Sequence, residues 1–550
     1  MSREAVAGIE IGNTSISRKL SILLCTFFLL SVFIVPLVQY GVDRADGISL
    51  LLTFPEQQET SSGDSFFTAV NRINKLALKQ MHVVEASLED NSLLRKVFLP
   101  PLQYVLLRFL GQGNEKAVVG RDGWLFFTPG VDYLVGPPLL DPEQQILREE
   151  SHEIWENPPS PDPLGAIIDF KEQLAIRDID LVVVPVPIKG AIHPEKLSSH
   201  AASGPLSNRS FATLVSLLED SGVHVYDARP VLARYARTKG DAYLATDTHW
   251  RPEAMQVVAA GLAEYVTENL ETFPQSLSLQ LQPQKVVGQG DVARMVTLPD
   301  KVSLYNSQEV SVHQVITEDN VFWQPDRNSE ILLLGDSFTN IYSLKGLGWG
   351  FGGGFAEHLS YALQHPLDLL ARNDAGAYAT REMLATELGR GRDRLSGKKL
   401  VIWQFAEREL AFGDWKGIKL KLGEVGESTF LVAEPGEILE VHGLVKSISQ
   451  SPRPGSVPYR DNLVTIHLVD LQSAGEPLAS DQALVYGWGM QDNKLSDLSG
   501  VRPGDNLSIL LSSWEEVEGE YGSYRRTPLD DEMLELELPN WGSVIDEKNM

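Results

Sequence analysis

Residues 330–340, EILLLGDSFTN, join a short apolar run to a glycine-containing turn that carries Ser337. Such a run suits a strand buried on both faces of a parallel sheet, and the turn then places Ser337 at the carboxyl end of that strand. A hydroxyl held there is exposed and lies near free backbone N–H groups, as a nucleophile requires. Gly-Asp-Ser is also ordinary turn composition, so this segment alone leaves a structural interpretation open.

A second segment, ATDTHWRPEAM at 245–255, supplies the two other groups that acyl transfer through serine needs. Pro252 suits a first helical turn, so Asp247 and His249 lie in the loop that enters this helix. Residues two apart in extended backbone point to the same side. We therefore predict that Asp247 orients His249 and that His249 takes the proton of Ser337.

Two other interpretations of the Asp-His pair remain. In the first, Asp247 or Thr248 merely caps the following helix and His249 is a surface residue. In the second, Asp247 and His249 bind a metal. The 11 histidines are scattered and form no close HxH or HExxH cluster, and one cysteine, Cys25, leaves no CxxC pair. We expect neither a metal nor a cofactor.

The chain around these segments alternates between helical and strand patterns, which predicts a doubly wound α/β sheet. The glycine-rich segment GLGWGFGGGF at 346–355 lacks a phosphate-loop ending and is expected to form a mobile loop beside the nucleophile. A hairpin is expected at 117–129, with its turn at Asp122-Gly123. Further strands are expected at 181–187, 224–227, 330–335 and 399–405, with helices near 162–177, 209–221 and 251–270.

After about Trp415 short β-rich stretches alternate with turn-rich segments, and no long helical period appears until the acidic tail. Residues 416–550 are therefore expected to form an antiparallel barrel or sandwich, with a small barrel of the OB type as the specific prediction. Two roles remain open for this unit: glycan binding, or structural support and partner docking.

Residues 20–38, LSILLCTFFLLSVFIVPLV, contain no charge and as a helix would span roughly 28 Å, close to the hydrocarbon thickness of a bilayer. A cleaved signal peptide is the alternative, but no small-x-small cleavage site follows. Arg18 and Lys19 precede the span, which predicts a single-pass inner-membrane protein with a cytoplasmic N-terminus and a periplasmic bulk. Residues 62–112 are expected to form a helical stalk interrupted at Pro100 and Pro101.

The net charge of -27 opposes association with phosphate backbones, so we expect no nucleic-acid partner. The expected division of the chain is a tail at 1–19, a transmembrane anchor at 20–38, a stalk at 39–114, an α/β catalytic domain at 115–415 and a β domain at 416–550.

Five blocks in order carry a resemblance: GRDGWLFF at 120–127, VPVPIKGAIHPEKL at 184–197, the DTHW block, the GDS block and VIWQFAERELA at 401–411. Over about 115–412 the chain resembles the AlgX/AlgJ family of SGNH-hydrolase-like alginate and polysaccharide O-acetyltransferases. The resemblance implies a flavodoxin-like parallel sheet with a permuted motif order, in which the Asp-His block precedes the serine. It also implies Ser337 as nucleophile, His249 as base and Asp247 as orienting carboxylate.

Membership of that family would make the protein a transferase that acetylates an exported polysaccharide, with a membrane-bound O-acyltransferase as acetyl supplier. The C-terminal region does not obviously match the carbohydrate-binding module of AlgX. Backbone N–H groups, with Asn340 or the glycine loop, are candidate oxyanion donors, and Lys189, Arg251 and Arg408 are candidates to line a basic substrate groove. A carbohydrate esterase with the same three residues and a non-catalytic scaffold are the alternatives.

Overall fold

The computed structural model divides into two compact units, Met1–Leu99 and Pro100–Met550. It describes residues 17–45, 66–153, 158–200, 204–270, 272–299, 302–373, 376–421, 430–454, 457, 459–473, 476–478, 480–529, 534 and 537–544.

The described residues of the first unit, 17–45 and 66–99, are almost entirely helical. Within the described part of the chain, α2 (Arg18–Ala45) contains the one candidate membrane span, Arg18–Val42, with a mean hydropathy of 2.6. Length and composition are the basis of that assignment, and an N-terminal signal sequence meets the same test. The predicted interruption at the two prolines is wrong, because both lie inside α4 (Leu93–Leu110). The chain breaks instead at Ser92, where α3 (Phe66–Asn91) has ended and the Ser92 hydroxyl accepts the N–H of Arg95 at 3.3 Å, as a helix cap does.

A five-stranded parallel sheet forms the centre of the second unit, in the order β4-β3-β9-β7-β8. Numbered along the chain, the five strands lie in the order 2-1-5-3-4, so the last strand, β9, is central and lies between β3 and β7. Ligands of open α/β sheets bind in a crevice beyond the carboxyl ends of the strands, and the crevice that concerns the site is the one at β7 and β9. The four strands predicted from apolar runs are present, and β8 adds a fifth. The strands are β3 (Asp180–Val186), β4 (His224–Val225), β7 (Ile331–Gly335), β8 (Asp368–Ala371) and β9 (Leu400–Ala406).

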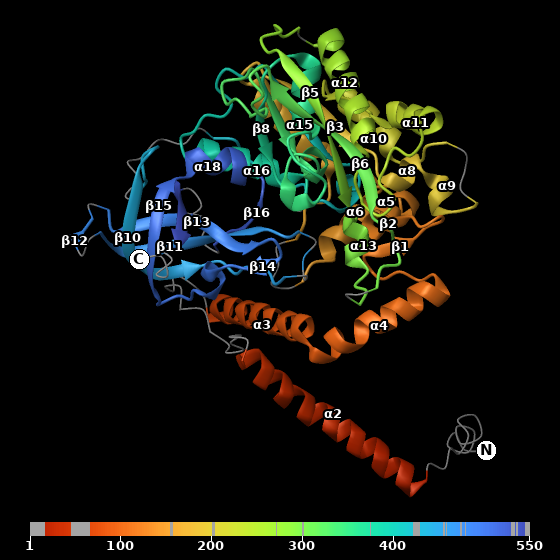
Figure 1. The fold of residues 1–550 in the computed structure, drawn as a ribbon, viewed down its shortest axis with the longest axis vertical. Helices are drawn as coiled ribbons and strands as arrows, with labels where there is room; N and C mark the ends of the chain where they lie inside the picture. Colours follow the sequence, from red (N-terminus) through yellow and green to blue (C-terminus); the bar gives the residue numbers. More distant parts are fainter. Residues whose placement is uncertain are drawn as a thin grey trace. The chain divides into compact units, whose positions relative to one another are not determined.

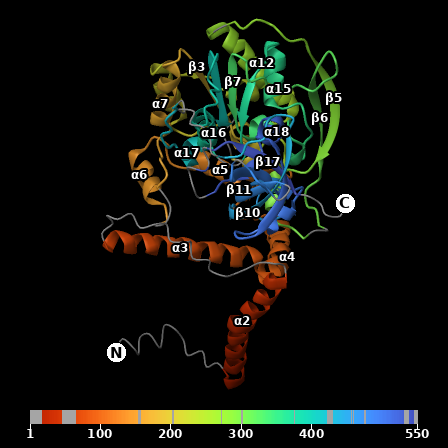
Figure 2. The same ribbon diagram turned by 90° about the vertical axis from the view of Figure 1, so that its left-hand side faces the viewer.

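Both faces of the sheet are buried, because successive side chains of each strand enter two different cores. Val182, Leu333 and Ile402 belong to one core, and their neighbours Val183, Leu334 and Trp403 belong to the other. Figure 2 shows α7 on one side of β3 and β7, and α12 and α15 on the other. The helices that contribute to the two cores are α7 (Pro163–Ala175), α10 (Phe211–Asp220), α11 (Arg229–Thr238), α12 (Pro252–Asn269), α15 (Phe355–Leu363) and α16 (Tyr378–Gly389).

Two antiparallel hairpins accompany the sheet (Figure 1). The predicted one pairs β1 (Ala117–Val119) with β2 (Leu125–Phe127), and its turn has positive φ at Asp122 and Gly123, which glycine and aspartate tolerate. The second, β5 (Leu279–Gly288) with β6 (Gln308–Thr317), was not predicted. Pro283 lies within β5, and a proline is tolerated there because β5 pairs along one side only, with β6.

Residues after 430 form a closed barrel, which confirms the predicted antiparallel β region. Following the pairings gives the ring β10-β11-β13-β17-β15, closed by β10 against β15; all pairs in the ring are antiparallel except β13 with β17. Arg390 donates to the Tyr486 hydroxyl at 2.8 Å and so ties α16 to the barrel. The strands and helix of the barrel are β10 (Ile438–Ile448), β11 (Asn462–Ser473), β12 (Glu476–Pro477), β13 (Gln482–Gln491), β14 (Lys494–Leu495), β15 (Asn506–Ser513), α18 (Trp514–Tyr521), β16 (Arg525–Thr527) and β17 (Pro539–Val544).

Short helices connect these parts and carry several residues of the site. They are α5 (Thr128–Val135), α6 (Pro142–Glu150), α8 (Lys189–Ile192), α9 (Pro194–Leu197), α13 (Asp291–Met295), α14 (Ser337–Asn340) and α17 (Glu409–Phe412).

Candidate active site

Ser337 begins α14 directly after β7, and the preceding Asp336 fixes that position. One carboxylate oxygen of Asp336 accepts the Phe338 N–H at 2.8 Å and the Gln404 side-chain N–H at 2.8 Å. The other accepts the Ala406 N–H at 2.7 Å. Asp336 therefore caps α14 and also joins the end of β7 to β9, which places Ser337 at the crevice of the sheet.

His249 lies between the serine and a carboxylate. Its Nε2 is 2.9 Å from Ser337 Oγ, and its Nδ1 is 2.6 Å from Asp247 Oδ1. An ionised carboxylate only accepts hydrogen bonds, so the proton of the neutral ring belongs on Nδ1, and Nε2 accepts the serine O–H. The three side chains predicted from two separate segments are thus hydrogen-bonded in series.

Asp247 is fully buried and accepts four N–H donors. Oδ1 accepts the backbone N–H of His249 at 3.0 Å as well as its ring, and Oδ2 accepts the Asp291 N–H at 3.0 Å and the Trp349 indole N–H at 2.8 Å. Burial alone would raise the pKa of Asp247, but the neighbouring imidazole and these donors hold it below its ordinary value. Asp247 therefore stays ionised.

Burial also affects the pKa of His249, but it favours the neutral imidazole and so acts in the opposite direction. Desolvation would lower the pKa of the imidazole, but the charge of Asp247 and its hydrogen bond raise it above the ordinary value. The aromatic ring of Phe338, centred 4.7 Å from the imidazole, covers one side of it. The imidazole is thus screened from water on that side, and its carboxylate partner makes it more basic.

Asp291 is a site residue that sequence reasoning missed. Its Oδ1 accepts the Thr248 N–H at 2.8 Å, its Oδ2 accepts the Thr248 hydroxyl, and its own N–H goes to Asp247. The preceding Gly290 is the one available signal, since a Cβ there would lie 2.0 Å from the Thr246 carbonyl oxygen. Only glycine permits this close approach of the two loops.

Trp349 is the second missed residue. It occupies the centre of the glycine-rich segment that was expected to be a mobile loop, yet its side chain is completely buried. The indole N–H bonds Asp247, so this part of the segment is held against the site. Gly348 and Gly350 on either side have φ of 84° and 105°, which lets the chain turn sharply around the indole.

Asp247, His249 and Asp291 also form a possible metal cluster, since one ligand atom from each lies within 4.8 Å of the others. The hydrogen bonds already use these atoms: Asp247 and Asp291 each accept two or more donors, and Nδ1 of His249 faces Asp247. A cation would have to displace those donors, so the arrangement favours a nucleophilic serine over a metal centre.

The remaining predicted site residues lie in different environments. Lys189 is buried, and its ammonium donates to the carbonyls of Leu244 at 3.0 Å, Ala245 at 3.1 Å and Asp247 at 2.6 Å, so it holds the loop that carries Asp247. Burial lowers the pKa of Lys189 to about 7. Asn340, also buried, donates its side-chain N–H to Asn373 at 3.0 Å.

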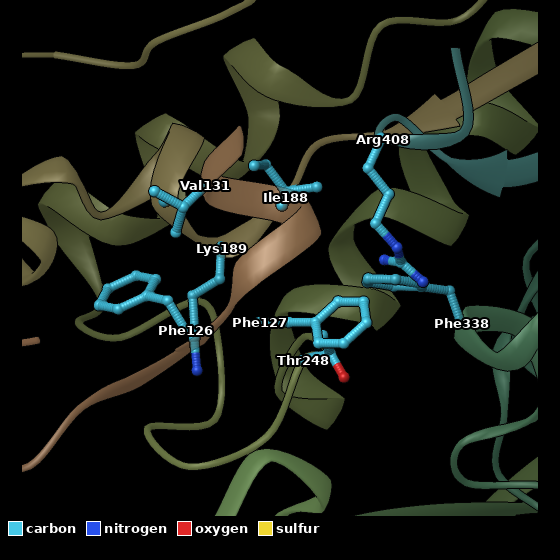
Figure 3. Close-up of a pocket in the computed structure, with 10 residues that line it drawn as sticks. Phe126, Phe127, Val131, Ile188, Lys189, Thr248, Phe338 and Arg408 are labelled. Atoms are coloured by element: carbon cyan, nitrogen blue, oxygen red, sulfur yellow. The ribbon is translucent and has the colours of Figure 1, made fainter. Parts of the chain in front are cut away.

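The two predicted arginines differ in their relation to the serine. Arg251 is the residue before α12 and lies 3.6 Å from the carboxylate of Glu253. Arg408 follows β9 and lines a pocket of about 310 Å³ together with Phe338 and Thr248, the neighbours of the nucleophile and of the base (Figure 3). Its guanidinium is centred 5.3 Å from the ring of Phe127. Arg408 is thus placed at the crevice.

A buried Asp-His-Ser series at the carboxyl ends of a parallel sheet is an arrangement suited to acyl transfer through a serine. Residues 117–407 match the family described as "SGNH hydrolase-like domain, acetyltransferase AlgX", and the chain belongs to that family. The resemblance found in the five blocks is thereby confirmed.

Several relatives share this region. The probable alginate O-acetylase AlgJ of Azotobacter vinelandii is 24% identical over 322 residues, which cover 56% of this chain and 72% of AlgJ. The AlgJ of Pseudomonas aeruginosa is also 24% identical over 322 residues, covering 56% of this chain and 73% of the relative. Among solved structures, the O-acetyltransferase domain of Pseudomonas putida AlgJ has a TM-score of 0.41 at 22% identity and covers 55% of this chain and 94% of the domain. Pseudomonas aeruginosa AlgX has a TM-score of 0.38 at 16% identity and covers 73% of this chain and 92% of AlgX.

Proposed function

We propose that this protein is a membrane-anchored O-acetyltransferase that passes acetyl groups through Ser337 to hydroxyls of an exported polysaccharide. The observation that carries the proposal is the hydrogen-bonded series from Asp247 through His249 to Ser337, at 2.6 and 2.9 Å. The family to which the chain belongs, and relatives named alginate O-acetylases, support acetyl transfer and a polysaccharide acceptor.

The reaction proceeds in two halves. His249 Nε2 takes the Ser337 proton as Oγ attacks the acetyl carbonyl; the bond to the donor breaks, and the leaving group takes the proton back from His249. An acetyl-serine results. A sugar hydroxyl then gives its proton to His249 and attacks that ester, and Ser337 recovers its proton as it leaves.

The developing oxyanion requires donors already in place. The backbone N–H of Ser337 is our proposed donor, because the first N–H groups of a helix have no intrahelical acceptor. Asn340 and the glycine loop are the other candidates, and Asn340 already donates one side-chain N–H to Asn373. The raised pKa of His249 suits its role as a base that must hold a proton in the transition state.

The wider assignments follow from the same proposal. Helix α2 anchors the chain in the inner membrane with a cytoplasmic N-terminus, and a membrane-bound O-acyltransferase delivers the acetyl group. The sheet order supports a permuted motif order, since β3 and β4 precede the serine strand β7 in the chain. Residues 115–415 form the catalytic domain and 416–550 an OB-like barrel in this proposal. The pocket position of Arg408 supports a part in substrate binding, whereas that of Arg251 stays a prediction.

The test uses the full chain in detergent with 4-nitrophenyl acetate and polysaccharide fragments. Mass spectrometry should find an acetylated Ser337 peptide and acetylated sugar in the wild type. Ser337→Ala should lose both, whereas Ser276→Ala, a serine exposed far along the chain from the site, should retain both.

Two outcomes would contradict the proposal. An acetyl-serine whose acetyl group passes only to water, with every fragment left unmodified, would make the protein a carbohydrate esterase. A folded wild-type protein that is never acetylated at Ser337 would indicate a non-catalytic scaffold.

A further inference from the structure

We propose that the pocket beside Ser337 binds the acyl group of the donor, and that Gly130, Val131 and Ile188 restrict it to short acyl chains. The inference rests on the proposed acyl-serine chemistry and adds what selects the group that is transferred.

The pocket adjoins the Asp-His-Ser series through that series' neighbours in the chain. Ser337 and His249 are not among the lining residues, but Phe338, which follows Ser337 directly, and Thr248, which precedes His249, both line the pocket. The Phe338 ring lies against His249, with the two rings centred 4.7 Å apart. A group bound between Phe338 and Thr248 therefore lies against the chain neighbours of Ser337 and His249, whose Oγ and Nε2 are 2.9 Å apart.

The walls suit an alkyl group rather than a sugar. Phe126, Phe127, Val131 and Ile188 supply apolar surface, and no carboxylate is among the lining residues that the structure describes. Two cationic side chains also line the pocket: the Lys189 ammonium is already bonded to three carbonyls, and the Arg408 guanidinium is centred 5.3 Å from the Phe127 ring and lies 3.7 Å from the carboxylate of Glu409. A sugar ring needs several polar partners because its hydroxyls are otherwise left unpaired on burial, whereas an acyl chain needs none.

The side of the pocket away from the serine sets the chain length that fits. Figure 3 shows Val131 and Ile188 at one end of the pocket and Thr248 and Phe338 at the other. The empty space of about 310 Å³ includes open solvent, so the enclosed part of the pocket is smaller than this and suits a small group.

Substitution of Gly130 offers a way to make the pocket shallower while the fold is kept. It lies inside α5, where glycine is a poor helix former, so alanine favours the helix. A Cβ at this position would lie 3.4 Å from Ile188 Cδ1, an ordinary contact. Gly130→Ala therefore adds a methyl group to the pocket wall without a clash.

The experiment measures acylation of Ser337 in the full chain by the 4-nitrophenyl esters of acetate, propionate, butyrate and hexanoate. In each case the bond from Ser337 Oγ to the acyl carbon forms, the bond to the aryl oxygen breaks, His249 takes the serine proton, and 4-nitrophenolate leaves. The burst of nitrophenolate gives the rate, and mass spectrometry locates the acyl group.

The wild type should acylate at least about 10-fold more slowly with butyrate than with acetate, since a misfitting methylene costs about that factor in an apolar pocket. Ile188→Ala should raise the butyrate rate relative to acetate by about 10-fold, and Gly130→Ala should lower the propionate and butyrate rates further. Ile192→Ala is the matched control, because Ile192 is as buried as Ile188, at 5% exposure, but does not line the pocket. It should leave the acetate-to-butyrate ratio unchanged.

Equal wild-type rates along the series would overturn the inference. So would an unchanged ratio in both pocket variants while Ser337 is still acetylated. Ile188→Val provides a milder enlargement if the alanine variant does not fold. These results differ from a failure of the proposed function, in which no ester acylates Ser337 in the wild type.

Discussion

Replacing Trp349 with phenylalanine removes one hydrogen bond from the buried carboxylate of Asp247. The indole N–H lies 2.8 Å from Oδ2, and the side chain is completely buried, so water does not replace the lost donor. Asp247 keeps its three other N–H donors, two from His249 and one from Asp291. We expect the carboxylate to remain ionised but less firmly oriented.

The cost follows from the charge of the acceptor. A hydrogen bond to a charged group contributes about 1.5–3 kcal/mol to stability, so Trp349→Phe should lose about that amount beyond the effect of the smaller ring. Looser orientation of Asp247 and His249 should slow acetylation of Ser337 by about 10-fold, equivalent to about 1.4 kcal/mol. The Trp349 hydrogen bond lowers the pKa of Asp247 because it stabilises the ionised carboxylate. The loss of stability in Trp349→Phe should therefore be complete at neutral pH and become smaller as the pH falls below about 4.

Trp403→Phe is the matched control. Trp403 is equally buried, and in the described part of the chain its indole N–H has no hydrogen-bond partner. Urea unfolding at pH 7 and the burst with 4-nitrophenyl acetate would be measured for both variants. Equal losses of stability in the two variants, together with an unchanged burst rate in Trp349→Phe, would refute a role for the Trp349 bond.

Three further perturbations test the electrostatics of the site and core. Acylation requires a neutral His249, and the pKa of His249 is raised, so the burst rate should reach half its maximum above pH 6.5. Asp247→Asn removes the charge that raises this pKa and should move the midpoint to lower pH. An unchanged midpoint would contradict the pairing of His249 with an ionised Asp247. Burial raises the pKa of Glu357 from 4.5 to about 7, so ionising this one group should lower the stability of the wild type by about 3 kcal/mol as the pH rises from 4.5 through 7. Glu357→Gln should remove that contribution, so the stability difference between variant and wild type, measured by urea unfolding, should change between pH 5 and pH 8. Lys189→Met removes the ammonium from the carbonyls of Leu244 and Asp247, whereas the Ala245 carbonyl keeps the Leu125 N–H at 2.9 Å. The variant should lose about 2–3 kcal/mol in unfolding free energy and acetylate Ser337 more slowly. Full stability would show that the loop does not depend on the ammonium.

The positions of Ser337 and of the Asp247-His249 pair could be predicted because each is specified by a few adjacent residues. An apolar run followed by Gly335 and Asp336 is enough to place Ser337 after a strand, and Pro252 is enough to place His249 before a helix. Predicting that the two segments lie together in space needed a second inference: the hydroxyl of one and the Asp-His pair of the other serve the same reaction. The sheet supports that inference physically by bringing the end of β7 to the loop before α12.

The residues that surround Asp247 could not be predicted from local pattern. Trp349 reaches it across 102 positions and Asp291 across 44, and neither lies in a segment whose composition indicates a donor. Strand β8 was missed because four residues carry too little pattern to separate a strand from a turn. Pro100 was given too much weight, since a cap at Ser92 decided where the helices divide.

The central position of β9 has a consequence for how the protein folds. Strands β3 and β4 pair with each other, as do β7 and β8, but β9 alone joins the two pairs. The segments that carry His249 and Ser337 therefore share one sheet only when β9 (Leu400–Ala406) is in place. Long-range pairing of this kind is slow to form, so we expect the joining of the two strand pairs to be a late step in folding. A chain that ends before residue 400 should therefore leave the Asp247-His249 pair and Ser337 on separate strand pairs.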